Sequence, residues 1–170
     1  MCGIAGILDS TAKRPPQNDE LIAMQCALRH RGPDGDGHWI SPQGNIGLAH
    51  VRLAIIDLSA KAAQPMTDGL DKVWITFNGE IYNHASLRKM LEEVGRLFVT
   101  DHSDTEVLIH GYLEWGIDGL VQRLEGMYSF AIWDCERKKL VLARDRIGIK
   151  PLYFTKTNGR FVFASEIKAI

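Results

Sequence analysis

Short runs rich in β-branched and aromatic residues dominate both ends of the chain, and this distribution restricts the fold more than any other feature. They lie at 2–8, 37–40, 46–56, 73–77, 127–133, 140–143, 151–154 and 161–164. Hairpin-length turns such as Asn158-Gly159 join several of these runs. The long apolar runs 53–56 and 130–133 predict strands covered on both faces. Helical periodicity is concentrated in the middle of the chain, so the pattern predicts an α+β fold and not a repeated βαβ unit.

Three segments have the apolar spacing of amphipathic helices. The first two are 21–31 and 83–94. The third begins at Ser103-Asp104-Thr105-Glu106, which matches a capping box, and is ended by Gly116. We also expect a shorter helical turn at 120–124.

Composition and charge exclude several classes of function. The chain has 170 residues with 20 basic and 21 acidic side chains, a formal net charge of −1. This balance gives no strong electrostatic case for binding nucleic acid or an anionic membrane surface. No apolar stretch approaches the roughly 20 residues that a membrane-spanning helix needs. Three cysteines without disulfide spacing indicate a reducing compartment, most simply the cytoplasm.

The length predicts a single domain over residues 1–170. The last six residues, 165–170, look like the opening of a further helix. We therefore expect the chain to be cut from a longer protein.

Cys2 is the most informative single residue. Removal of the initiator methionine is expected before a small second residue, and it leaves Cys2 with both a thiol and a free α-amine. With a pKa of about 7.7–8.0, roughly 10% of that amine is unprotonated and basic at neutral pH. A nucleophile activated by its own α-amine is a recognised catalytic arrangement. Position alone favours the alternative, a small buried residue at the start of a strand.

Asn78 and Gly79 follow a strand and precede a helix. Asn-Gly commonly forms a type I′ hairpin turn, but we expect no partner strand to follow directly. An Asn amide beside an unshielded Gly N–H can instead supply two donors to an oxyanion. Both interpretations stay open on this segment alone.

Arg52 and Asp104 are the other two candidate binding residues. Arg52 is a lone cation in an apolar run, either an edge-strand arginine paired with Asp57 or a planar fork for a substrate carboxylate. Asp104 lies in the expected capping box, where a carboxylate stabilises the helix N-terminus. It is equally suited to hold a substrate ammonium group.

We find no metal-ion or phosphate loop. The Gly- and Asp-rich segment 29–37 fails as a calcium loop, because counting from Asp34 places Trp39 and Asn45 where Gly and Glu are needed. No Gly-x-x-x-x-Gly-Lys-Ser/Thr sequence occurs, and the six histidines have no zinc spacing. Segment 29–37 is therefore expected to be a turn-rich loop with satisfied charges.

Six segments in order resemble the class II glutamine amidotransferases, a family of N-terminal-nucleophile hydrolases, and within it the glutamine-dependent asparagine synthetases. They are Met1-Cys2-Gly3-Ile4, Arg29-His30-Arg31-Gly32-Pro33-Asp34, the segment 77–83, His102-Ser103-Asp104-Thr105-Glu106, the segment 144–153, and Phe163-Ala164-Ser165-Glu166-Ile167-Lys168. The resemblance covers essentially the whole chain and implies a four-layer αββα sandwich of two antiparallel sheets.

The resemblance also implies a role for each candidate residue. Cys2 would be the nucleophile on the glutamine side-chain amide, with Asn78 and Gly79 as the oxyanion hole. Arg52 would bind the α-carboxylate of glutamine, and Glu80 and Asp104 would hold its α-ammonium. The backbone of the next four residues would line the pocket: Leu53, Ala54, Ile55 and Ile56.

The implied function is glutamine hydrolysis to glutamate and ammonia, the ammonia serving ATP-dependent amidation of aspartate. ATP and Mg²⁺ are expected only in a C-terminal synthetase domain, and this domain would need neither cofactor nor metal. The expected partners are glutamine, the synthetase domain and, as an option, a second copy of the chain. The alternatives are a glutaminase domain serving another acceptor and a non-catalytic docking domain of the same fold.

Overall fold

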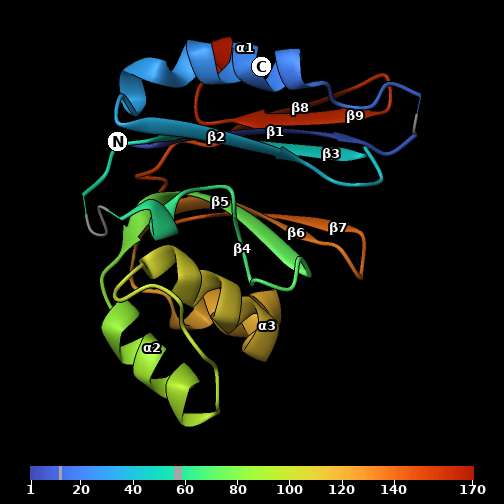
Figure 1. Ribbon diagram of the computed structural model, residues 1–170. Coiled ribbons are helices and arrows are strands. Elements are labelled where there is room, and N and C mark those ends of the chain that lie inside the picture. The colour runs from blue at the N-terminus through green and yellow to red at the C-terminus, as the bar shows by residue number, and fades with distance from the viewer. Residues whose placement is uncertain (12, 56–58) are drawn as a thin grey trace.

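The computed structural model describes residues 1–11, 13–55 and 59–170, and it has four layers (Figure 1). A helix covers one antiparallel sheet, a second antiparallel sheet packs beneath the first, and two helices cover its far side. The predicted αββα sandwich of the α+β class is confirmed.

The first sheet has the strand order β2-β3-β1-β9-β8. Its strands are β1 (Gly3–Asp9), β2 (Gly35–Ile40), β3 (Ile46–Arg52), β8 (Tyr153–Thr157) and β9 (Arg160–Ala164). Its outer face packs on α1 (Asn18–Leu28), which continues into a 3-10 turn at Arg29–Arg31. Ala5, Ile7 and Ala49 meet Leu21 and Leu28 there, because alternate residues of a strand face the helix.

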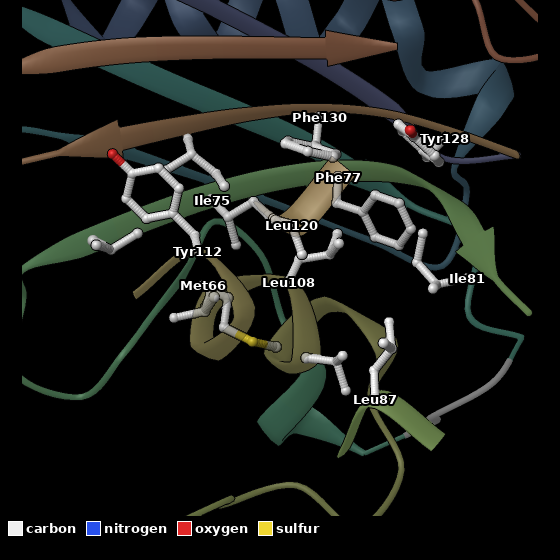
Figure 2. Close-up of a cluster of buried hydrophobic side chains, with 14 of the residues drawn as sticks. Met66, Ile75, Phe77, Ile81, Leu87, Leu108, Tyr112, Leu120, Tyr128 and Phe130 are labelled. Carbon is white, nitrogen blue, oxygen red and sulfur yellow. The ribbon is translucent and has the colours of Figure 1, made fainter. Parts of the chain in front are cut away.

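The second sheet has the order β4-β5-β6-β7. Its strands are β4 (Met66–Thr67), β5 (Val73–Ile81), β6 (Gly126–Asp134) and β7 (Lys139–Arg144). Its outer face packs on α2 (His84–Glu93) and α3 (Asp104–Arg123). Figure 2 shows Phe77 and Ile81 of β5 pointing toward Leu87 and Leu108 in this core. Short 3-10 turns at Ala60–Ala62 and Ile167–Ala169 complete the described elements.

The inner faces of the two sheets form the central core. Ile4 and Phe163 of the first sheet are fully buried against a cluster that includes Ala131 and Trp133 of β6. Two polar contacts also cross the gap: Thr76 Oγ1 donates to Ala49 O at 3.1 Å, and His50 Nε2 contacts Phe77 O at 3.1 Å. These contacts fix β5 against β3, and therefore the two sheets against each other.

The structure corrects two strand boundaries that bear on the site. β5 does not end at Phe77 but continues through Asn78 and Gly79 to Ile81, because β6 pairs with its whole length. The segment therefore has a partner strand, distant in sequence. β3 ends at Arg52, so the expectation of a doubly covered strand is wrong for residues 53–55, where Ile55 is 69% exposed; Ile56 lies outside the described residues. The same expectation for 130–133 is confirmed.

The helices lie close to their predicted positions, with one local correction. α3 runs from Asp104 and breaks at Gly116, whose φ of 67° is left-handed, and a second helical stretch follows as predicted. The capping box at Ser103 is wrong, because the Ser103 side chain makes no cap hydrogen bond. The Glu106 carboxylate instead accepts hydrogen bonds from the backbone N–H groups of Val99 and Thr100.

We expect Leu108→Ala to lower the free energy of unfolding by about 2–5 kcal/mol, the usual cost of such a cavity. Leu108 is fully buried one turn after Asp104, in the core between α3 and the second sheet. The matched control is Leu97→Ala, since Leu97 is 85% exposed, and it should change stability by less than about 0.5 kcal/mol. Urea denaturation of both variants checks this. Equal decreases in the free energy of unfolding would show that the core is misassigned.

Candidate functional site

A cleft opens at the end of the inter-sheet layer, where the N-terminus enters the first sheet. It gathers residues from the start of β1, the end of β3, the end of β5 and the first turn of α3. Nearly every sequence-predicted site residue lines it: Cys2, Arg52, Leu53, Ala54, Ile55, Asn78, Gly79, Glu80 and Asp104. Ile56, the remaining one, lies outside the described residues.

Cys2 lies directly before β1 with its thiol against the backbone of Leu53. Leu53 N–H is 3.4 Å and Leu53 O is 3.5 Å from Cys2 Sγ. Burial raises the pKa of the Cys2 thiol, and the Leu53 N–H and the nearby Arg52 only partly offset this. The thiol therefore needs a base before it can act as a nucleophile. While Met1 is attached, the nitrogen of Cys2 is a peptide amide.

The segment 29–37, expected to be a turn-rich loop, holds Cys2 in place. Arg31 Nε donates to Cys2 O at 2.9 Å, and Arg31 Nη1 donates to Glu166 Oε1 at 2.8 Å. The bond from Arg31, together with His30 and Lys168, lowers the pKa of Glu166 to about 2. The expectation of satisfied charges holds only in part: Arg29 pairs with Asp36 at 3.3 Å, but Arg31 Nη2 is buried without a hydrogen-bond partner among the described residues. The guanidinium of Arg31 also fixes the backbone of the candidate nucleophile, Cys2. This role of Arg31 was not predicted from the sequence.

Beyond the short pairing with β4, the side of β5 opposite β6 directs backbone N–H groups toward the cleft. Phe77 N donates to Gln64 Oε1 at 2.6 Å, and Ile81 N donates to Asp104 Oδ2 at 3.1 Å. N–H groups two residues apart in a strand point the same way, so the Gly79 N–H between them also points away from β6. A Cβ on Gly79 would collide with Met127 O and the Phe77 ring, so only glycine fits here.

Asn78 is 1% exposed and lies on the face of β5 that looks toward the first sheet. Its Nδ2 has no hydrogen-bond partner among the described residues. An amide donor left unpaired in a buried position costs stability, about 1–3 kcal/mol for a typical group. The amide of Asn78 and the N–H of Gly79 are thus two donors from adjacent residues at one cleft.

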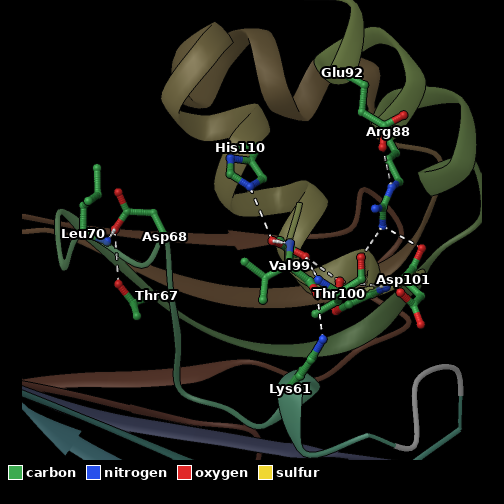
Figure 3. Close-up of polar contacts among 12 residues, drawn as sticks. Lys61, Thr67, Asp68, Leu70, Arg88, Glu92, Val99, Thr100, Asp101 and His110 are labelled. Atoms are coloured by element: carbon green, nitrogen blue, oxygen red, sulfur yellow. Dashed lines mark hydrogen bonds and ion pairs between the residues drawn. The ribbon is translucent and has the colours of Figure 1, made fainter. Parts of the chain in front are cut away.

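Asp104 is the first residue of α3 and is 6% exposed. Burial raises its pKa to about 6, although the Ile81 N–H bond works in the opposite direction. Figure 3 shows the contacts that fix the preceding segment: Arg88 Nη1 donates to Thr100 O at 2.8 Å and to Asp101 O at 2.7 Å. The carboxylate is therefore held in a fixed position. Burial disfavours its ionised form, which a bound cation would stabilise.

Arg52 ends β3 and lines the same cleft. Its Nη1 donates to Ser59 O at 3.1 Å, while its backbone O accepts from Asp34 N at 3.0 Å. Asp34 Oδ2 in turn accepts from Ala54 N at 2.9 Å. Glu80 reaches the cleft from β5. The cleft thus offers one guanidinium and two carboxylates, a set that complements a zwitterionic amino acid.

Several lining residues were not predicted from the sequence. Gln64 bridges β5 and α3, with its Nε2 donating to Thr105 Oγ1 at 3.1 Å. Lys150 is 6% exposed and brings a second cation to the cleft. Neither stands out in the sequence, because each acts through chain segments that only the fold brings together. The other unpredicted lining residues are Met1, Ala62, Phe77, Ser103, Thr105 and Met127.

Across 1–11, 13–55 and 59–170, no group of three or more His, Cys, Asp or Glu side chains is placed to hold a metal ion. No described helix is both long and apolar enough to cross a membrane.

The family model of the glutamine amidotransferase domain matches residues 1–170. The chain therefore belongs to the glutamine amidotransferase domain family. The resemblance identified from the six sequence segments is confirmed, and the chain is an enzyme domain of this type.

Similar proteins agree with this family. Asparagine synthetase [glutamine-hydrolyzing] 3 of Bacillus subtilis is 42% identical over 172 residues, which cover 100% of this chain and 27% of that protein. Asparagine synthetase [glutamine-hydrolyzing] 1 of the same organism is 40% identical, covering 100% of the chain and 26% of the protein. Amidase chry2 of Gibberella zeae is 35% identical, covering 99% and 26%. The chain thus spans about a quarter of the length of these curated relatives.

The fold has a solved counterpart in another glutamine amidotransferase. The glutamine phosphoribosylpyrophosphate amidotransferase from B. subtilis, complexed with ADP and GMP, superposes with a TM-score of 0.83 at 24% identity. The match covers 99% of this chain and 42% of that one. At this identity the likeness supports the fold alone.

We expect Asp104→Asn to stabilise the protein increasingly as pH rises from 4 to 7. Because the folded-state pKa of about 6 exceeds the ordinary 3.8, the folded protein holds a proton between these values that the unfolded chain has released. The free energy of unfolding of the parent therefore falls as pH rises over this window. The difference between the two pKa values corresponds to a loss of about 3 kcal/mol.

Urea denaturation of parent and variant at pH 4, 5, 6 and 7 measures this gain. Asp118→Asn, on the exposed side of the same helix, controls for loss of a carboxylate in general. Parallel stability curves for parent and Asp104→Asn would contradict the assignment of a buried, proton-binding Asp104.

Proposed function

We propose that this domain hydrolyses the side-chain amide of glutamine to glutamate and ammonia through a γ-glutamyl thioester on Cys2. The observation that carries the proposal is the single cleft that collects the Cys2 thiol, the unpaired Asn78 amide and the buried Asp104 carboxylate. Membership of the glutamine amidotransferase domain family supports the choice of glutamine as substrate.

In the proposed first step, Cys2 Sγ attacks the amide carbon of glutamine. The carbonyl oxygen becomes an oxyanion, which accepts hydrogen bonds from Asn78 Nδ2 and the Gly79 N–H. Asn78 Nδ2 has no protein partner to give up among the described residues, and the Gly79 N–H points away from β6, so both can donate when the charge develops. Collapse of the intermediate releases ammonia and leaves the thioester, which water then hydrolyses.

The base in this scheme is the α-amine of Cys2 after removal of Met1. Burial keeps the thiol protonated, so the amine accepts the thiol proton and delivers it to the departing nitrogen. A chain that retains Met1 has no such amine and is therefore expected to be inactive.

Glutamine binding is assigned to the charged residues around the thiol. Arg52 would bind the α-carboxylate, and Asp104 with Glu80 would hold the α-ammonium. The backbone of residues 53–56 would line the pocket, with Leu53 already in contact with Cys2. These roles carry over the expectations from the sequence and rest on the shared cleft.

We further propose that the ammonia serves ATP-dependent amidation of aspartate by a C-terminal synthetase domain. The support is the similarity to proteins named asparagine synthetase [glutamine-hydrolyzing], which are about four times the length of this chain. ATP and Mg²⁺ would belong to that domain, while glutamine hydrolysis itself needs no cofactor. We place the protein in the cytoplasm, without nucleic-acid or membrane partners, and with homodimerisation as an option.

A second candidate is a glutaminase domain that serves a different acceptor. The similarity to a protein named amidase supports this candidate, since the chain covers 26% of that protein. The cleft described here would act identically in both cases, because the acceptor lies outside it.

We expect the purified chain, after removal of Met1, to release glutamate and ammonia from glutamine with or without ATP–Mg²⁺, and to form no asparagine from added aspartate. Cys2→Ala should abolish release without changing the fold, because only the nucleophile is lost. Separate assays of glutamate, ammonia and asparagine, with circular dichroism, check this. Cys26→Ala is the matched control, since Cys26 is exposed on α1. Turnover by Cys2→Ala, or an absolute need for ATP, would contradict the proposal.

Asn78→Ala and Arg52→Ala should differ in which kinetic constant changes. Loss of one oxyanion donor lowers kcat by about 10²–10³-fold, with little change in KM, because the donor acts mainly on the transition state. Loss of Arg52 should instead raise KM, because a bidentate carboxylate contact is removed. Steady-state kinetics at saturating and limiting glutamine separate the two patterns, and a reversed pattern would show that the roles are misassigned.

A further inference from the structure

Lys150 is a buried cation that the proposed reaction does not yet use. It is 6% exposed and lines the same cleft as Cys2. Among the described residues, its Nζ forms no ion pair with a carboxylate, and the one polar contact that it makes is a hydrogen bond donated to Met1 Sδ at 3.3 Å. Lysine is seldom buried without a partner, because removing its charge from water is costly.

The backbone around Lys150 is fixed from both sides. Lys150 N donates to Asp145 Oδ2 at 2.9 Å, and Arg144 Nε donates to Lys150 O at 2.7 Å. Asp145 Oδ1 also accepts from Ile149 N at 2.8 Å. The turn therefore presents the side chain to the cleft, and no loop rearrangement is needed to bring it there.

The side chain of Lys150 contacts the N-terminal residue of the chain. Its Nζ touches the side chain of the residue that directly precedes Cys2. When Met1 is removed, this contact disappears, and Lys150 and the new α-amine of Cys2 belong to the same cleft. The other charged groups around this end of the chain are Arg31, Arg52, Glu80 and Asp104.

A neighbouring positive charge destabilises the protonated form of an amine. An ordinary α-amine, with a pKa of about 7.7–8.0, is only about 10% free base at neutral pH. A decrease of about one pKa unit, the size expected from a cation several ångströms away in a partly buried cleft, makes about half of it free base.

We propose that Lys150 acts on the reaction through the α-amine of the processed Cys2, keeping it unprotonated and available as a base at neutral pH. The inference rests on the proposed function, in which this amine is the base. Lys150 is thus assigned to the proton-transfer step and not to the binding of glutamine.

The direct test is the titration of that amine in the chain without Met1. In protein labelled with ¹³C-cysteine, the Cα resonance of Cys2 reports amine protonation without any substrate. Lys150→Met keeps the length of the side chain and removes the charge, and should raise the titration midpoint by about one pH unit. Lys150→Arg keeps the charge and should retain the parent midpoint. Lys89→Met, on the exposed side of α2, is the control.

The same shift in the protonation of the amine should appear in the pH dependence of turnover. In Lys150→Met, the acidic limb of kcat/KM for glutamine should move to higher pH, with the plateau at high pH within about twofold of the parent. If Lys150→Met does not fold, Lys150→Gln replaces it in both measurements.

An unchanged amine midpoint in the neutral variant overturns the assignment of Lys150, and so does a loss of turnover that is equal at every pH. Glutamine hydrolysis that persists beside an unchanged midpoint leaves the proposed function standing while this inference fails. A shifted midpoint in a chain that does not hydrolyse glutamine supports the effect of Lys150 on the amine and contradicts the proposed function.

Discussion

The face-to-face packing of the two sheets is the constraint on which the rest of the structure depends. Apolar residues such as Ile4, Phe163 and Trp133 fill the space between the sheets, and burial of this kind of surface is the main driving force of folding. The His50 and Thr76 contacts then lock β3 and β5 together. Burial lowers the pKa of His50 to about 4, so the crossing contact is made by a neutral ring. The cleft exists because β1 enters this sandwich beside the end of β5.

Several residues of the cleft are polar groups whose burial destabilises the folded protein. That they lie in one cleft therefore points to a functional role. The Asn78 amide lacks a partner in the described structure, Asp104 carries a raised pKa, and Lys150 is buried with no paired carboxylate among the described residues. Unpaired or desolvated polar groups are disfavoured in a fold selected for stability alone. Perturbed groups that meet in one cleft are typical of functional sites. Around them, fully satisfied clusters such as Glu106 with Val99 and Thr100 keep the scaffold rigid.

Much of this arrangement could be predicted from local sequence. The α+β class, the three helices and most strands follow from apolar spacing and turns, and these depend on neighbouring residues. The continuation of β5 through Asn78 and Gly79 could not be predicted this way, because its partner β6 lies about fifty residues downstream. The capping box at Ser103 failed for a related reason. The fold gives the Glu106 carboxylate better donors in the preceding loop. Although burial opposes ionisation, hydrogen bonds from His110, Thr100 and Val99 lower its pKa to about 2. Gln64 and Lys150 carry no local signal, since their significance comes from contacts between distant segments.

The central claim is that glutamine is attacked by an N-terminal Cys2 whose own amine serves as the base. The most direct measurement is intact-protein mass spectrometry of the chain after rapid acid quenching during turnover with glutamine, followed by mapping of the modified peptide. We expect a chain that has lost Met1 and carries one glutamyl group on Cys2. A glutamyl group on another residue, or the same adduct on a chain that retains Met1, would contradict it.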